Sequence, residues 1–168
     1  LYTACAGVAP EFCLPVMLDA GTNNQELLEG PHYLGLLQKR ERGPAYDEFV
    51  DEFVQAVQEI YPRACIQFED FGNANAFRLV REYRDRICTF NDDIQGTAAV
   101  ALVGILSALR ITGGEPALAI LFQGAGAGAA GIGIGELVVE ALKAHGIAEA
   151  DARRQCWFVD SKGLVVAS

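Results

Sequence analysis

Acidic residues follow two short apolar runs of the sequence, each with the length of a buried strand. Glu69 and Asp70 come directly after residues 65–68, and Asp93 comes shortly after residues 87–90. Open α/β sheets bind ligands at the carboxyl ends of their strands, so these three carboxylates are expected to lie near one another. A ligand set made only of oxygen favours Mg²⁺ or Mn²⁺ over zinc. The spacing therefore predicts a divalent metal site.

The same acidic residues also have a purely structural interpretation. A carboxylate after a strand is typical of the N-cap of the following helix, where it accepts hydrogen bonds from free N–H groups and meets the helix dipole. Spacing alone does not separate the two interpretations. A metal held here could act as a Lewis acid toward the oxygen atoms of a bound substrate.

A glycine-rich segment lies between a strand-like run ending at Phe122 and a helix expected to reach about Ala144. It satisfies the dinucleotide pattern G-x-G-x-x-G/A in two frames: Gly126, Gly128 and Gly131, or Gly124, Gly126 and Ala129. Glycine lets the backbone turn tightly and approach a pyrophosphate at the helix N-terminus. Asp160, at the end of the next strand, is placed to accept hydrogen bonds from the adenosine ribose. The alternative is a Gly/Ala-rich helix start that only allows close packing.

Alternating strand-like and helical patterns must position these residues. Strands are expected at residues 14–18, 65–68, 87–90, 117–122 and 156–159. Helices are expected at residues 44–60, 75–83, 97–110 and from the glycine-rich segment to 144. This order predicts the α/β class, with the end of one α/β domain joined to the start of another.

Composition argues against several classes of partner. The formal charge of −9 and the scattered basic residues argue against binding to nucleic acid or an anionic membrane. No apolar run is expected to reach the roughly 18 residues needed to span a bilayer. The five cysteines are odd in number and include no C-x-x-C, so reduced thiols in a cytosol-like compartment are expected. The start at Leu1 and the stop after a strand-like run predict an internal fragment of an enzyme.

Several segments resemble the malic enzyme family. They are CLPVMLDAGTNN at 13–24, QFEDF at 67–71, FNDDIQGT at 90–97 and VDSKG at 159–163. The resemblance implies that the three carboxylates are the metal ligands and that Asp92 supports a catalytic lysine preceding Leu1. Asp160 and Ser161 would bind the cofactor together with the turn glycines. Residues 1–91 would end a substrate- and metal-binding domain, and residues 92–168 would begin a doubly wound, Rossmann-type NAD(P)-binding domain.

The resemblance also implies an activity. Malic enzymes oxidise (S)-malate with NAD or NADP and a divalent cation, Mg²⁺ or Mn²⁺, and release pyruvate and carbon dioxide. Asp160 suits a free ribose hydroxyl, which favours NAD slightly, whereas Ser161 and Lys162 could meet the 2′-phosphate of NADP. A malolactic enzyme, which releases lactate, and a non-catalytic dinucleotide-binding homologue are the alternatives. The complete enzyme is expected to be a homo-oligomer, a dimer or tetramer, in the cytoplasm or an organellar matrix.

Overall fold

The structure is a computed structural model that describes residues 2–114, 119–123, 128–160 and 162–165. The chain divides into two compact units, Leu1–Ile60 and Tyr61–Ser168. The two strands that precede the carboxylates and the glycine-rich segment both belong to the second unit. Each unit is described by itself below.

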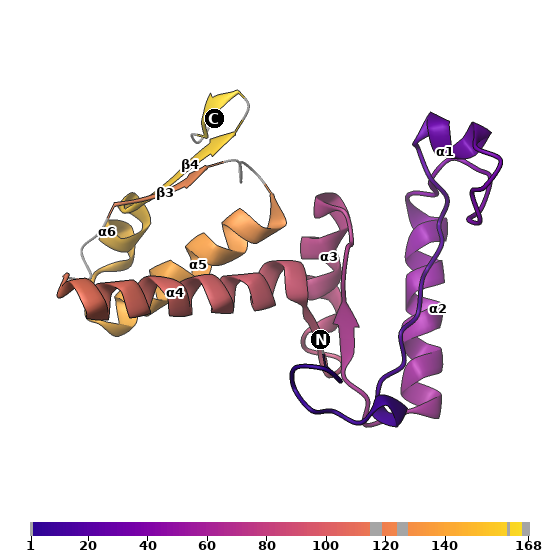
Figure 1. Cartoon of the computed structure of the whole chain (residues 1–168), viewed down its shortest axis with the longest axis horizontal. Coiled ribbons are helices and arrows are strands. Elements are labelled where there is room, and N and C mark those ends of the chain that lie inside the picture. The colour runs from indigo at the N-terminus through magenta and orange to yellow at the C-terminus, as the bar shows by residue number, and fades with distance from the viewer. Residues whose placement is uncertain (1, 115–118, 124–127, 161, 166–168) are drawn as a thin grey trace. The chain divides into compact units, whose positions relative to one another are not determined.

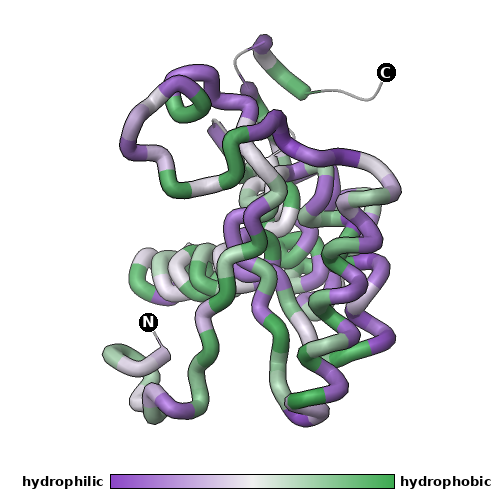
Figure 2. The backbone as a smooth tube through the Cα atoms, turned by 90° about the vertical axis from the view of Figure 1, so that its right-hand side faces the viewer, coloured by the Kyte–Doolittle hydropathy of each residue, from purple (hydrophilic) through white to green (hydrophobic). Residues whose placement is uncertain are grey.

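The main element of the first unit is the helix α2 (Pro44–Ile60), which confirms the predicted helix (Figure 1). Proline is well suited to the first turn of a helix, where its missing N–H is not needed. Apolar residues recur at helical spacing, so Tyr46, Val50 and Val54 are buried on one face. The tube in Figure 2 accordingly alternates between hydrophobic and hydrophilic residues along α2.

The rest of the first unit is largely irregular, with only η1 (Pro10–Phe12) and α1 (Gln25–Glu29) as short helical turns. The predicted strand at 14–18 is wrong, because these residues adopt no regular structure and Met17 is 89% exposed. An apolar run becomes a buried strand only beside a partner strand, and none of the described residues pairs with this one. The loop after it is fixed by Asp19, whose carboxylate accepts hydrogen bonds from the N–H groups of Gly21 and Leu36.

The second unit begins with a βαβ arrangement: β1 (Ile66–Phe68), α3 (Asn73–Tyr83) and β2 (Thr89–Asn91). The strands are parallel, with Ile66 beside Thr89 and Phe68 beside Asn91. The ring of Phe68 packs 5.9 Å from that of Tyr83, so the helix covers the strand pair with apolar contacts. The predicted strands and helix are confirmed here, with ends shifted by one or two residues.

After a turn of π-helix, η2 (Asp92–Gly96), the second unit continues through α4 (Thr97–Thr112), β3 (Ile120–Gln123), α5 (Ala129–Ala144), α6 (Glu149–Arg154), β4 (Cys156–Asp160) and β5 (Gly163–Leu164). β3 and β4 are parallel, and β5 pairs antiparallel with β4. Val138, Val139 and Leu142 of α5 form a buried cluster with Ala152. These elements confirm the predicted strand before the glycine-rich segment, the helix after it and the strand that ends near Asp160, and α6 lengthens the connection to β4.

The helical segment Asp92–Thr112, which joins η2 and α4, corrects one prediction. It has 21 residues, and an 18-residue window within it has a mean hydropathy of 1.7, so it is long and apolar enough to cross a membrane by length and composition alone. Leu102 and Ile105 pack against the α5 cluster, whereas Val100 and Ile111 are mostly exposed. The uninterrupted apolar stretch within this helix is shorter than 18 residues, because Asp92, Asp93, Gln95 and Arg110 lie near its ends.

Candidate metal site and dinucleotide turn

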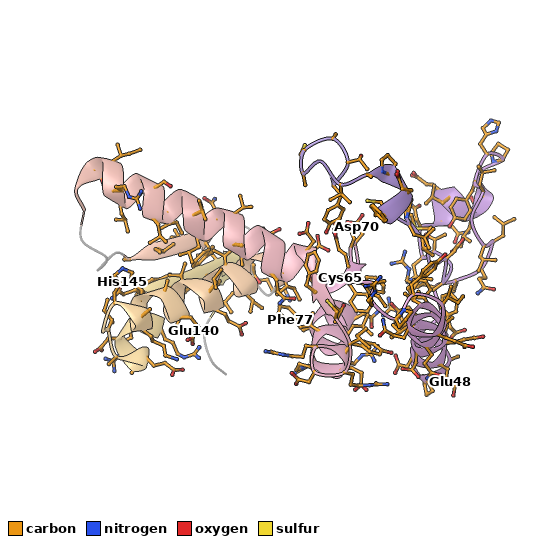
Figure 3. The ribbon with its side chains drawn as sticks, turned by 90° about the horizontal axis from the view of Figure 1, so that it is seen from below. Glu48, Cys65, Asp70, Phe77, Glu140 and His145 are labelled. Carbon is orange, nitrogen blue, oxygen red and sulfur yellow. The ribbon has the colours of Figure 1, made fainter. Side chains whose placement is uncertain are left out.

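The structure brings Glu69, Asp70 and Asp93 together at the carboxyl end of the β1–β2 pair. One carboxylate oxygen from each residue lies within 4.8 Å of the others. The parallel register explains this, because the chain leaves β1 beside the point where it leaves β2. These oxygen–oxygen separations suit a cation whose oxygen ligands lie about 2.0–2.6 Å from it, because opposite ligands are then about 4–5 Å apart. Figure 3 labels Asp70, together with Cys65 before the other end of β1.

A hydrogen bond from a backbone N–H to a side-chain carboxylate joins the two turns that carry these carboxylates. The N–H of Asp70 donates to Oδ2 of Asp93 over 2.9 Å. Asp70 has a φ of 59°, in the left-handed region that aspartate tolerates better than most residues. This left-handed backbone therefore turns the Asp70 N–H toward Asp93 and keeps the two carboxylates together at the carboxyl end of the β1–β2 pair.

The alternative interpretation, that these residues cap helices, is wrong. The N-cap of α3 is Gly72, and that of α4 is Gly96, and neither helix start receives a side-chain cap bond. The cap of η2 is Asn91, whose Oδ1 accepts a hydrogen bond from the N–H of Ile94 over 3.0 Å. The carboxylates are thus left free of a capping role.

The cluster carries negative charge that its own residues do not balance. Partial burial raises the pKa of Glu69, although its side chain remains largely exposed, and repulsion from Asp93, Asp92 and Asp70 raises it further. A 2.6 Å hydrogen bond from the Gln67 amide opposes this rise in the Glu69 pKa. A bound cation would remove the repulsion.

The π-helical turn η2 fixes the position of Asp92. A β-carbon built on Gly96 would lie only 1.9 Å from Oδ1 of Asp92, so the Asp92 carboxylate occupies the space that glycine leaves. Asn91 is fully buried, and its N–H donates to Oε1 of Gln95. Turns of π-helix inside α-helices occur frequently at functional sites. Sequence reasoning missed Asn91, although asparagine before a helix start is a typical N-cap signal.

A cleft of about 620 Å³ lies between Asp93, one of the three carboxylates, and the start of α5. Its lining residues come from the carboxylate side and from the β3–α5 connection: Phe71, Asn73, Asp93, Leu121, Phe122, Gln123, Gly128, Ala130, Gly131 and Ile134. Gly128 is the N-cap of α5, so the free N–H groups at the start of this helix lie at the cleft. The chemistry available is binding of an anionic group beside a cation. No role was predicted for Phe71, Asn73 or Gln123, although Phe71 belongs to the QFEDF segment at 67–71.

The structure describes only some of the other residues that were predicted to bind the cofactor. Gly124, Gly126 and Ser161 lie outside the described residues. Asp160 ends β4 and is half-buried, and its Oδ1 accepts a 2.7 Å hydrogen bond from the N–H of Lys162. The strand end therefore carries a carboxylate where the sequence predicted it.

Comparison with models of protein families shows which family the chain belongs to. Residues 1–84 match the model of the malic enzyme N-terminal domain, and residues 94–168 match the model of the malic enzyme NAD-binding domain. The chain belongs to the malic enzyme family. The predicted boundary between residues 91 and 92 lies in the interval that the two matches leave between them, and it stays a prediction.

Individual malic enzymes are similar over the whole chain. The NADP-dependent malic enzyme of Sus scrofa is 57% identical over 99% of this chain, which corresponds to 30% of that protein. The mitochondrial NADP-dependent malic enzyme of Homo sapiens is also 57% identical, with 99% of this chain and 28% of the relative covered. The crystal structure of the Entamoeba histolytica malic enzyme matches with a TM-score of 0.59 and 29% identity, over 72% of this chain and 23% of that one. The chain thus spans less than a third of these relatives.

Proposed function

We propose that this chain forms the metal- and dinucleotide-binding centre of an enzyme that oxidises and decarboxylates (S)-malate to pyruvate and carbon dioxide. The observation that carries the proposal is the cleft shared by Asp93 and the start of α5. A hydride transfer needs substrate and dinucleotide side by side, and a decarboxylation needs a cation beside the substrate. Both requirements converge on this cleft.

In this proposal Glu69, Asp70 and Asp93 hold Mg²⁺ or Mn²⁺. The donor set contains only oxygen, the hydrogen bond from Asp70 N–H orients Asp93, and the repulsion that raises the pKa of Glu69 is relieved by a cation. When bound, the cation supplies Lewis acidity to the hydroxyl and carboxylate oxygens of the substrate. Asp92, held against Gly96, supports a lysine that acts as general base.

The dinucleotide is proposed to bind at the N-terminus of α5. Gly124, Gly126, Gly128 and Gly131 would let its pyrophosphate approach the backbone, and Asp160 and Ser161 would meet the adenosine ribose. We assign NADP rather than NAD, because the relatives above are named NADP-dependent and give no support to the slight preference for NAD. The exposed Lys162, next to Asp160, supplies a positive charge for the 2′-phosphate.

The proposed partner is the small molecule malate, with neither nucleic acid nor a membrane involved. We assign α4 to a soluble domain, because it packs on α5 through Leu102 and Ile105. Its exposed Val100, Val103 and Ile111 are available for contacts within a homo-oligomer. Both a cytoplasmic and a mitochondrial location are compatible with the relatives, some of which are named mitochondrial.

The test is a steady-state assay of the complete protein with malate, Mn²⁺ and each dinucleotide, in which pyruvate and lactate are quantified. Malate-dependent NADPH formation with equimolar pyruvate is expected. Asp93→Ala should abolish it, while Asp85→Ala, which removes an exposed carboxylate away from the cluster, should leave it unchanged. Lactate without reduced dinucleotide would mean malolactic chemistry instead, and full activity of Asp93→Ala would overturn the metal assignment.

A further inference from the structure

Two cysteines lie opposite each other at the amino ends of β1 and β2. Ile66 pairs with Thr89 in parallel register, so the preceding residues, Cys65 and Cys88, are also neighbours. Two hydrogen bonds fix this register: Ile66 N–H donates to the Cys88 carbonyl over 3.0 Å, and the Thr89 hydroxyl donates to the Ile66 carbonyl over 2.6 Å. The Cys88 thiol lies close enough to that of Cys65 to contribute to the raised pKa of Cys65. The pair is thus aligned by the sheet itself.

The geometry of parallel strands permits a covalent bond between the two sulfurs. Neighbouring strands lie about 4.8 Å apart, within the range of about 4.4–6.8 Å that separates the Cα atoms of disulfide-linked cysteines. Register partners in a parallel pair point to the same face of the sheet. Both cysteines are free and exposed, so an external oxidant can reach them. Figure 3 labels Cys65 at this end of β1.

Cys156 provides the contrast within the same unit. It also stands at the start of a parallel strand, β4, but its register partner is Ile120. Cys156 therefore has no thiol beside it in the strand pair. Position at the start of a strand is common to all three cysteines, and only the pairing of Cys65 with Cys88 sets them apart.

We propose that Cys65 and Cys88 form a reversible dithiol–disulfide pair that links β1 to β2 at the end opposite the carboxylate cluster. The oxidant is a low-molecular-weight disulfide such as oxidised glutathione. The thiolate of one cysteine attacks it, forms a mixed disulfide and releases one glutathione thiolate; the second cysteine then attacks the protein sulfur and releases the other glutathione. Two protein thiols are oxidised, one disulfide is reduced to two thiols, and the two protons pass to the released glutathione.

The surroundings set the pH dependence and the structural effect of this reaction. Partial desolvation of the largely exposed Cys65 side chain, followed by the neighbouring Cys88 thiol, raises the pKa of Cys65, so its reactive thiolate is scarce at neutral pH and the reaction accelerates as pH rises. The bond would close a loop that contains α3 and would restrict the unfolded chain. It lies about three strand residues, or about 10 Å, from the carboxylate end of β1, so it need not touch the proposed metal ligands.

The experiment incubates the protein with oxidised glutathione at pH 8, alkylates the remaining thiols and maps the cysteines by mass spectrometry. Loss of two alkylated thiols, a crosslinked peptide pair containing Cys65 and Cys88, and full recovery with dithiothreitol are expected. Cys88→Ser should leave Cys65 as a glutathione mixed disulfide, whereas Cys156→Ser should keep the crosslink.

A second readout separates a specific link from simple surface oxidation. The oxidised protein should melt at least about 5 °C above the reduced protein, and Cys88→Ser should remove this difference. Alkylation of all five cysteines after oxidation, mixed disulfides at both positions without a crosslink, or a link to another cysteine would each overturn the proposal.

Discussion

Replacement of Gly133 by alanine tests how α5 is seated on the turn that carries Asp93. A β-carbon at Gly133 would lie 2.5 Å from the backbone oxygen of Ile94 and 3.1 Å from its carbonyl carbon. Backbone atoms cannot move aside as the end of a side chain can, so α5 must shift away from η2. Overpacking of this kind costs about 1–3 kcal/mol, and the higher helix propensity of alanine returns about 0.5–1 kcal/mol. Because the contact is with backbone atoms, the cost falls in the upper part of its range, about 2–3 kcal/mol, and the net loss of unfolding free energy is about 1–2 kcal/mol.

Gly104→Ala is the matched control, because Gly104 lies in α4 and nothing stands within 4 Å of its β-carbon position. This variant should gain about 0.5–1 kcal/mol. Urea unfolding followed by the fluorescence of Trp157, the single tryptophan of the chain, reports on the second unit. With a slope near 2 kcal/mol per molar urea, the midpoint of Gly133→Ala should fall by roughly 0.5–1 M. An unchanged midpoint for Gly133→Ala, or an equal fall for Gly104→Ala, would refute the packing argument.

Further substitutions test the individual contacts. Asn91→Ala removes the cap acceptor for Ile94 N–H at a buried site, so unfolding free energy should fall by about 1–3 kcal/mol; a loss below about 0.5 kcal/mol would contradict this. Gly96→Ala must displace the Asp92 carboxylate, so malate oxidation should collapse while the unfolding midpoint changes little, and a normal rate would contradict the placement of Asp92. Two backbone N–H groups, and a nearby arginine to a smaller extent, lower the pKa of Asp19 below 3.8. The Asp19 carboxylate therefore contributes fully to the stability of the folded protein above pH 3.8, and this contribution is lost as pH falls through the folded-state pKa. Asp19→Asn should therefore flatten the acid side of the stability curve, measured by denaturation across about pH 2–5, and an unaltered curve would argue against it.

The parts of the fold that could be predicted depend on local pattern. The stripe of α2 and the strands at 66–68 and 89–91 follow from apolar spacing, and the meeting of Glu69 with Asp93 follows from parallel strand ends. The apolar run at 14–18 has the composition of a strand, but composition cannot supply the neighbouring strand that it would need. That prediction failed because pairing is a tertiary property.

The finer geometry of the site depends on contacts between residues distant in sequence. Nothing in the local pattern distinguishes the π-helical turn at Asp92 from the start of an ordinary helix. The left-handed backbone of Asp70 becomes intelligible only through its hydrogen bond to Asp93. The close approach of Gly133 to Ile94 likewise needs the packed structure. Family resemblance correctly identified the chain, whereas the shape of the cleft depends on the folded structure.

Binding of Mn²⁺ to the protein, followed by the loss of the electron paramagnetic resonance signal of free Mn²⁺, tests the central claim most directly. We expect one Mn²⁺ site, with affinity reduced at least about tenfold in Asp93→Ala and unchanged in Asp85→Ala. Equal Mn²⁺ affinity in the unaltered protein and Asp93→Ala would contradict it, because the cation would then not be held by the carboxylates at the end of β1 and β2.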